Sequence, residues 1–312
     1  MQKQYTKVKK ILVEEKSIGQ RIDNFIINMF KKISKNTVYT IIRKGRIRIN
    51  KKRIKAKYKL KKKDIIRIPP IYLENKKKKK INVKYYKNLI QKNILYEDKY
   101  FIIINKPQKV AVHGGSGISF GIIEIIRRLY SKEKSLELIH RLDKDTSGVL
   151  LISKKKFILK SLHDQIKNRK TKKTYIAITH GKWPEKIKKI QLPLLNTKNI
   201  YGKKIVLVKK NGKKSETRFK VIKIYKNVTL LKIYPITGRT HQIRVHTSSV
   251  GHPIINDTRY GNKILDKKIN INYKNLCLHA FKFTFQHPKT NKKVNIVAEN
   301  FKFKNFNIKS IK

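Results

Sequence analysis

Apolar side chains near the start of the chain recur at the spacing of two short amphipathic helices. They are Ile22, Phe25, Ile26, Met29 and Phe30 for the first helix, and Val38, Ile41 and Ile42 for the second. Ser34 and the polar residues after it predict the N-cap of the second helix, and Gly45 predicts its end. Apolar runs at 47–49 and 65–68 predict short strands. Residues 11–70 therefore predict a small α/β unit with basic faces, typical of an RNA-binding module, although a solvated accessory domain has the same pattern.

A lysine-rich linker at 71–91 and a larger domain at 92–304 are predicted for the rest of the chain. Strand-like runs in the larger domain lie at 100–104, 149–153, 174–179, 205–208, 218–224, 229–234 and 281–285. Helical spacing is clear only near 118–130 and 157–168, so strands and helices do not alternate as in a parallel α/β fold. The pattern predicts an α+β domain built on a mixed, largely antiparallel sheet.

The charge balance narrows the function. Lys and Arg total 80 and Asp and Glu total 18, which gives a formal net charge of +62. Such a charge opposes compaction unless a polyanion or salt neutralises it, so nucleic acid is the expected partner. Lysine greatly outnumbers arginine, as an AT-rich coding sequence would produce. The few arginines therefore carry more weight, since they mark positions where a planar, bidentate cation is needed.

Several classes of protein are disfavoured. No apolar run approaches the ~20 residues of a membrane-spanning helix, and no apolar stretch typical of a signal peptide follows the basic N-terminus. The single cysteine, Cys277, excludes an intramolecular disulfide. The glycine-rich segment 112–117 lacks the pattern of a nucleotide-binding loop. We therefore expect a cytoplasmic protein without a membrane partner.

Two of the few carboxylates lie in a polar segment at 140–148, directly before an apolar strand. The segment also contains Arg141, a histidine and two hydroxyl side chains. A buried strand holds such a loop firmly, which is common for functional loops. We assign chemistry to Asp143 and favour a turn-capping role for Asp145.

A second polar cluster spans residues 237–246 and contains Arg239 and Arg244. Thr240 is predicted to cap a helix that ends at Gly251. The histidines of this region lack zinc-type i, i+4 pairing and cysteine partners, so no metal site is expected. No G-x-S-x-G elbow is present, which disfavours a serine hydrolase.

The segment at 140–148, H-R-L-D-K-D-T-S-G, resembles the H-R-L-D-x-x-T-S-G signature of the pseudouridine synthases that modify large-subunit ribosomal RNA. The resemblance covers nearly the whole chain. Supporting segments lie at 105–107, 111–117, 173–175, 215–219, 238–246 and 278–280. Residues 19–23 resemble the S4 RNA-binding domain that these enzymes carry at the N-terminus. Residues 113–117 and the run after Thr146 favour the C branch of the family over the D branch, which modifies a different hairpin.

The resemblance implies three catalytic roles. Asp143 matches the essential aspartate, which acts on the target uridine as nucleophile or as base at the ribose. Tyr175 matches the tyrosine that stacks on the uracil and takes the final proton, and Arg244 matches the basic residue that pairs with the aspartate. A guanidinium beside the carboxylate favours its ionised form, which either role of Asp143 requires.

The resemblance also implies the partners. We expect Arg141 and Arg239 to contact RNA beside a flipped-out uridine, and Arg21 and Arg43 to contact RNA from the N-terminal unit. The expected substrate is several specific uridines of 23S rRNA, in naked RNA or in a large-subunit assembly intermediate. The enzyme is expected to act as a monomer without cofactor or metal. The alternatives are a D-branch synthase and a non-catalytic ribosome-assembly factor that has kept the fold.

Overall fold

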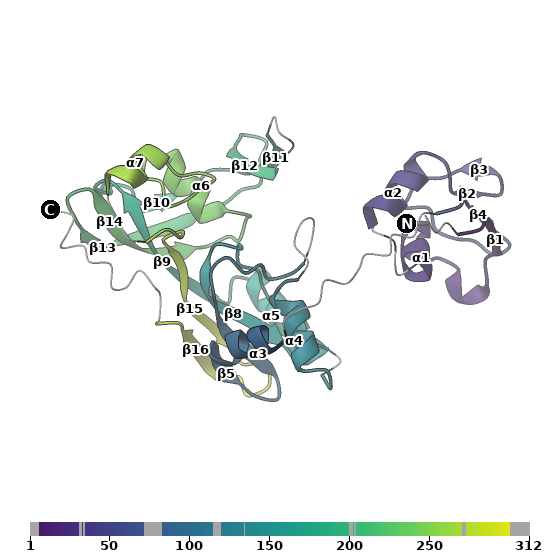
Figure 1. The fold of residues 1–312 in the computed structure, drawn as a ribbon, viewed down its shortest axis with the longest axis horizontal. Helices are drawn as coiled ribbons and strands as arrows, with labels where there is room; N and C mark the ends of the chain where they lie inside the picture. Colours follow the sequence, from purple (N-terminus) through teal and green to yellow (C-terminus); the bar gives the residue numbers. More distant parts are fainter. Residues whose placement is uncertain are drawn as a thin grey trace. The chain divides into compact units, whose positions relative to one another are not determined.

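A computed structural model describes residues 6–30, 33, 35–71, 83–114, 120–133, 135–199, 202, 204–269 and 273–299 of the chain. The chain divides into two compact units, Met1–Lys80 and Ile81–Lys312, which are coloured along the sequence in Figure 1. The lysine run of the predicted linker, the predicted cap Ser34 and the glycines at 115 and 117 lie outside the described residues.

The N-terminal unit is a four-stranded antiparallel sheet packed against two helices. Its elements are β1 (Lys9–Leu12), the 3-10 turn η1 (Glu15–Ser17), α1 (Ile22–Met29), α2 (Lys35–Arg43), β2 (Arg48–Ile49), β3 (Lys52–Arg53) and β4 (Ile65–Ile68). The strand order is β1-β4-β2-β3. Ile22 and Ile26 of α1 pack with Ile42 of α2 and Ile66 of β4 in one buried cluster. The helices and strands predicted from apolar spacing are confirmed, and β1 and β3 are additional edge strands.

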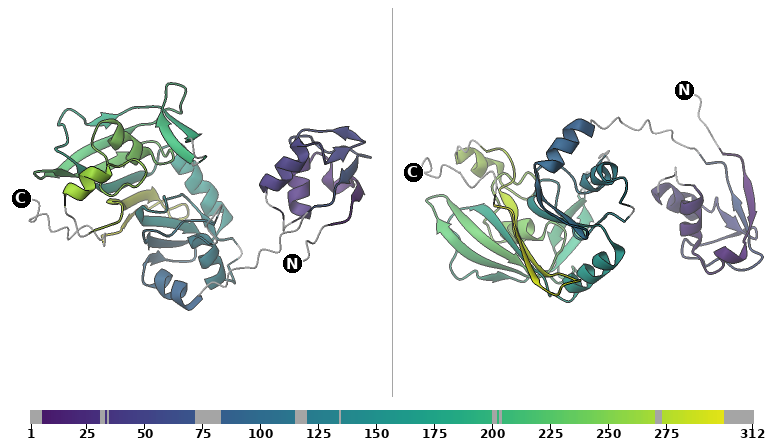
Figure 2. Two further views of the ribbon diagram at one scale, coloured as in Figure 1. Left: turned by 45° about the horizontal axis from the view of Figure 1, so that its top comes forward. Right: turned by 90° about the horizontal axis from the view of Figure 1, so that it is seen from below.

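The larger unit contains a ten-stranded mixed sheet (Figure 2). Its strands are β5 (Ile94–Glu97), β6 (Phe101–Lys106), β7 (Glu137–Leu138), β8 (Ser147–Ser153), β9 (Lys172–His180), β10 (Lys189–Ile190), β13 (Thr217–Ile224), β14 (Val228–Pro235), β15 (Leu278–Gln286) and β16 (Lys293–Val297). The main order is β10-β13-β14-β9-β15-β8-β6-β5, with β16 beside β15 and β7 beside β8. β15 and β8 pair in parallel, and the other strand pairs described in this sheet are antiparallel. The predicted α+β fold on a mixed, largely antiparallel sheet is confirmed.

Helices cover both faces of β6 and β8. Ile102 and Ile104 of β6 pack in the cluster that includes α4 (Ile122–Leu129) and α3 (Val83–Gln91). Phe101 and Ile103 pack instead with α5 (Lys156–Lys167). Burial on both faces explains why the sequence of these strands is continuously apolar rather than alternating.

Part of the predicted linker is helical. Residues 83–91 form α3, in which Ile90 is 1 % exposed and packs in the same cluster as α4. This helix was not predicted from the sequence, because its polar and basic residues resemble those of the lysine-rich segment before it. Two further helices, α6 (Gln242–Ser249) and α7 (Lys263–Lys268), and a separate hairpin of β11 (Leu194–Lys198) and β12 (Lys204–Val208) complete the unit.

Gly148 fixes the point at which the 140–148 segment enters β8. Its φ is +111°, and a side chain there would overlap the carbonyl oxygen of Ala280 in the neighbouring strand β15. Only glycine meets both conditions, because it has no Cβ and adopts positive φ at low cost. The loop before β8 is therefore held against the centre of the sheet.

Candidate active site

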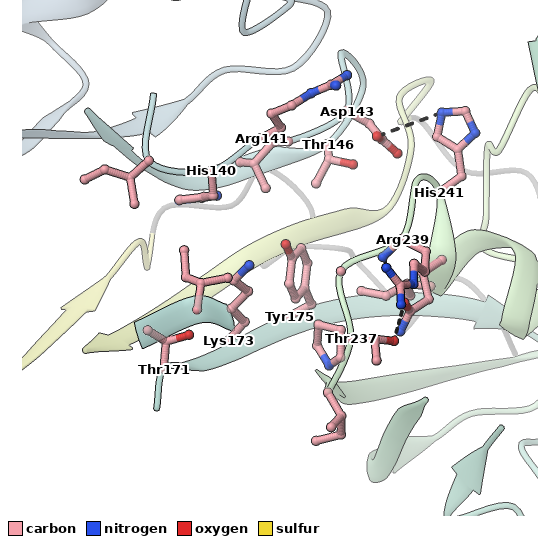
Figure 3. A pocket seen from close by; sticks show the side chains of 18 of the residues that line it. His140, Arg141, Asp143, Thr146, Thr171, Lys173, Tyr175, Thr237, Arg239 and His241 are labelled. Carbon is pink, nitrogen blue, oxygen red and sulfur yellow. Dashed lines mark hydrogen bonds and ion pairs between the residues drawn. The ribbon is translucent and has the colours of Figure 1, made fainter. Parts of the chain in front are cut away.

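A cavity of about 760 Å³ opens beside this loop (Figure 3). Its walls come from the segment before β8, the strand β9, the turn after β14 and the start of α6. Five of the seven residues predicted to act on RNA line it, namely Asp143, Tyr175, Arg244, Arg141 and Arg239. Residues far apart in the sequence thus meet around one opening.

Asp143 sits on a turn that its neighbours anchor. Leu142 is 6 % exposed and packs into the core between β6, β8 and α4. The backbone N–H of Thr146 donates to the carbonyl oxygen of Asp143 at 3.2 Å and closes the turn. The Asp143 side chain itself remains 28 % exposed. Its backbone is therefore held by the turn, while its carboxylate is open to the cavity.

The buried side chain of Lys106, at the end of β6, supports the same turn. Its side chain is fully buried, and its Nζ donates to the carbonyl oxygens of Pro107, Val110 and Lys144 at 2.7, 2.8 and 3.0 Å. Burial lowers the pKa of Lys106 to about 7, and the charges of Asp145 and Asp143 oppose that shift. Three acceptors match the three N–H groups of an ammonium. Lys106 therefore ties the end of β6 to the loop that carries Asp143.

Replacing this lysine has a predictable cost. We expect Lys106→Met to lower the free energy of unfolding by about 2–4 kcal/mol, because three buried carbonyl groups lose their donor. Urea denaturation followed by the fluorescence of Trp183, the single tryptophan of the chain and a buried residue of this unit, measures the loss. Lys160→Met, on the exposed side of α5, is the control. Equal stability of the two variants would contradict the supporting role.

Arg244 joins two carboxylates. Its Nε and Nη2 donate to Oδ2 and Oδ1 of Asp257, both at 2.7 Å, and its Nη1 donates to Oδ2 of Asp143 at 3.3 Å. Asp257 is buried, which opposes its ionisation, yet the Arg244 guanidinium and the backbone N–H groups of Tyr260 and Arg259 outweigh burial and lower the pKa of Asp257. The predicted pairing of Arg244 with Asp143 is present, but the stronger, bidentate partner is Asp257.

The start of α6 differs from the prediction. The residue at the N-cap position is His241, not Thr240, and the His241 side chain makes no capping hydrogen bond to the helix. His241 has φ +51°, in the left-handed region. Gln242 organises the turn instead: its Oε1 accepts hydrogen bonds from the backbone N–H of Arg239 and the hydroxyl of Thr237 at 3.0 and 2.7 Å. The helix ends before Gly251, which has φ +82°, as the sequence predicted.

Tyr175 stands on β9 and projects into the cavity from the side opposite the Asp143 loop (Figure 3). Burial, and then the negative charge of Asp143, raises the pKa of its phenol. The phenol therefore keeps its proton at neutral pH and presents an uncharged aromatic face. His140, whose ring stacks on Phe283 with centroids 5.0 Å apart, is also neutral, because burial lowers its pKa to about 3.

The four arginines predicted to contact RNA occupy different places. Arg141 and Arg239 are exposed at the rim of the cavity, and Arg239 Nε donates to the carbonyl of Lys214 at 3.2 Å. Arg43 is exposed at the end of α2 in the N-terminal unit. Arg21 is partly committed elsewhere, because its guanidinium pairs with the buried Asp23.

Neither a metal centre nor a membrane helix is found among the described residues. They contain no cluster of three or more histidine, cysteine or acidic side chains that could hold a metal ion. Within the same part of the chain, no helix has the length and apolarity needed to span a bilayer.

Comparison with known proteins connects this geometry to a family. The profile of RNA pseudouridylate synthases matches residues 100–249, and that of the S4 domain matches residues 20–66. The ribosomal large subunit pseudouridine synthase C of Buchnera aphidicola from Schizaphis graminum is 50 % identical over 304 residues, covering 96 % of this chain and 97 % of the relative. The protein of the same name from Pasteurella multocida is 45 % identical, covering 93 % and 90 %. The chain belongs to the RNA pseudouridylate synthase family.

The synthase is therefore an isomerase that converts uridine in RNA to pseudouridine. Its fold also resembles human RNA pseudouridylate synthase domain containing 4, with a TM-score of 0.56 at 24 % identity, covering 71 % of this chain and 93 % of the human one. The S4 match falls in the N-terminal unit and the synthase match in the larger unit.

Two residues that shape the site were not singled out from the sequence. Asp257 was missed although it is one of only 18 acids, and this scarcity was the signal that could have found it. Lys106 was noted only within a supporting segment, and one lysine among so many gave no sign of being buried. Both act through contacts that apolar periodicity does not report.

Proposed function

We propose that the synthase converts several specific uridines of 23S rRNA to pseudouridine, with Asp143 as the catalytic carboxylate. The observation that carries the proposal is the cavity that holds Asp143 beside the Arg244 guanidinium and across from the Tyr175 ring. The name of its relatives, ribosomal large subunit pseudouridine synthase C, supports the large-subunit RNA as substrate.

The chemistry fits these groups. Isomerisation breaks the C1′–N1 bond, turns the uracil in place and forms a C1′–C5 bond, after which C5 loses its proton. A carboxylate beside a guanidinium can act at the ribose, as nucleophile at C1′ or as base. The Tyr175 ring offers a face on which the detached uracil stacks without its rotation being fixed. Because its phenol stays protonated, we assign Tyr175 to stacking; the proton that C5 loses passes to water, and N1 takes one from water in return.

The substrate nucleotide must leave its stack to enter the cavity, and this costs least in a loop or bulge. We assign Arg141 to holding the opened RNA and Arg239 to a phosphate at the rim. Arg43, Arg21 and the abundant lysines add affinity that falls with salt, as phosphate contacts do. No cofactor is assigned, since the reaction transfers no electron, phosphoryl or methyl group.

We further propose that the synthase acts as a monomer in the cytoplasm on naked RNA or an assembling large subunit. The test uses an unmodified 23S rRNA transcript incubated with the protein, followed by carbodiimide labelling and primer extension. Stops at a few defined uridines support the proposal, and stops confined to one other hairpin would move the protein to the D branch. Tight RNA binding without any stop on either the transcript or an isolated subunit precursor would support a non-catalytic assembly factor.

A further inference from the structure

Asp143 has a second neighbour besides Arg244. Nε2 of His241 lies 3.9 Å from Oδ1 of Asp143, whereas Arg244 approaches the other oxygen, Oδ2. The two carboxylate oxygens thus face two different groups, and Figure 3 shows the contact with His241. A distance of 3.9 Å is longer than a hydrogen bond, but contacts of this kind often shorten when substrate fills the site.

The backbone of His241 holds its side chain in this position. His241 has φ +51° and is 14 % exposed. The left-handed conformation costs a residue other than glycine on the order of 1 kcal/mol, and such conformations persist where surrounding structure fixes them. Here the turn is fixed by Gln242, and the imidazole is clamped on its other nitrogen.

Tyr260 provides that clamp. Its Oη lies 2.7 Å from Nδ1 of His241 and accepts a hydrogen bond from the backbone N–H of Val206 in β12 at 3.0 Å. The Tyr260 ring also lies under the guanidinium of Arg244, with 5.3 Å from Cζ to the ring centroid. Tyr260 packs with Leu194, Val206 and Val245. One tyrosine therefore supports both groups that face Asp143.

These contacts select one tautomer of His241. Because Val206 donates to the phenol oxygen, the phenol hydrogen is available to donate to Nδ1, which leaves the imidazole hydrogen on Nε2, toward Asp143. The other neutral tautomer would turn a lone pair toward the carboxylate and leave the phenol hydrogen without this acceptor. Burial lowers the pKa of His241, and burial raises the pKa of Tyr260. Both groups are neutral near pH 7.

We propose that His241 is a positioning residue for Asp143: its imidazole, fixed as the Nε2–H tautomer by Tyr260, donates a hydrogen bond to the catalytic carboxylate when RNA is bound. The inference rests on the proposed catalytic role of Asp143. A second donor would orient the carboxylate, so that Oδ1 and Oδ2 are each engaged when the ribose arrives.

Other charged groups surround His241 and Asp143, and they stay unchanged while the His241 hydrogen bond is tested. Those facing His241 are Asp143, Arg244, Arg259 and Asp257, and those facing Asp143 also include Lys106 and Tyr175. All of them remain in the test variants. An effect of substituting His241 or Tyr260 on the rate or the tautomer is therefore attributable to the hydrogen bond that His241 donates to Asp143.

The first test separates the donor from the backbone. Asparagine adopts the left-handed conformation readily, so His241→Asn keeps the turn but is too short to reach Asp143. We expect its kcat on saturating RNA to fall about tenfold, because the carboxylate loses a donor that orients it, with RNA Kd and thermal unfolding unchanged. His241→Gln, whose amide reaches the place of Nε2, should recover part of the loss. A wild-type kcat in His241→Asn would show that only the backbone matters and would overturn the proposal.

The second test reads the tautomer without activity. In 15N-histidine-labelled protein, the His241 signals are those missing from the spectrum of His241→Asn. We expect a protonated Nε2 and an unprotonated Nδ1 at pH 7 in the wild type, and a shift toward protonated Nδ1 in Tyr260→Phe. An imidazolium or an Nδ1–H tautomer in the wild type would overturn the proposal. A wild type that does not isomerise RNA would instead overturn the proposed function, so the two failures are distinguishable.

Discussion

Asp143→Asn is expected to abolish isomerisation while leaving RNA binding nearly intact. The amide has the shape of the carboxylate but cannot act as nucleophile or base at the ribose, so the single-turnover rate should fall by about 10⁴-fold or more. The Asp143 side chain is 28 % exposed and lies on a loop whose buried anchors are other residues. The exchange should therefore cost little stability, and RNA affinity should stay within about fivefold, since only one charge of the cavity changes.

The rate is measured on a short RNA stem-loop carrying tritium at C5 of the target uridine. Isomerisation replaces that hydrogen, so tritium enters the solvent once per turnover. Glu137→Gln makes the same change of charge at an exposed carboxylate six positions earlier and should retain the wild-type rate. Activity within about tenfold of wild type in Asp143→Asn would remove Asp143 from the catalytic role.

Arg244→Ala is expected to lose both activity and stability. Asp257 is fully buried, and its carboxylate depends on the guanidinium of Arg244 for two hydrogen bonds of 2.7 Å. Removing one partner of a buried pair strands the other charge, which typically costs 3–5 kcal/mol. Activity should fall as well, because Asp143 loses its contact with Nη1. Urea denaturation followed by Trp183 fluorescence measures the stability loss, and tritium release measures the rate.

A double-mutant cycle isolates the pair. Arg244→Met combined with Asp257→Leu removes both charges, so the double variant should regain much of the stability that Arg244→Met loses. It should remain inactive, because Asp143 still lacks its guanidinium. Additive stability losses, with no coupling between the two positions, would contradict the buried ion pair as the cause.

Apolar patterning predicted the interior of the fold well and its edges poorly. The run at 101–104 is buried on both faces, so its sequence is continuously apolar and easily recognised. The strands β11 and β16 are partly exposed and carry lysine and asparagine, which weakens their alternation. The helix α3 was assigned to the linker because its polar residues match the lysine-rich segment that precedes it.

The loop that carries Asp143 was predictable from the sequence, whereas the residues that support it were not. Asp143 and Arg239 stand in short segments where scarce acids and arginines gather, and a family signature covers the first. The contact between Asp143 and Arg244 spans 101 positions, and the sequence indicated it only through the resemblance. The left-handed turn at His241 and the burial of Lys106 depend on tertiary packing, to which neither periodicity nor composition is sensitive.

The most direct measurement of the central claim, that Asp143 drives isomerisation of uridine in ribosomal RNA, is the pseudouridine content of an unmodified 23S rRNA transcript after incubation with wild type or Asp143→Asn. The RNA is digested to nucleosides, and pseudouridine is separated from uridine by chromatography and counted per transcript. We expect a small whole number of pseudouridines with the wild type and none with Asp143→Asn at equal RNA occupancy. Equal counts for the two proteins would contradict the role of Asp143, and no pseudouridine with the wild type, on the transcript or on a subunit precursor, would contradict the proposed substrate.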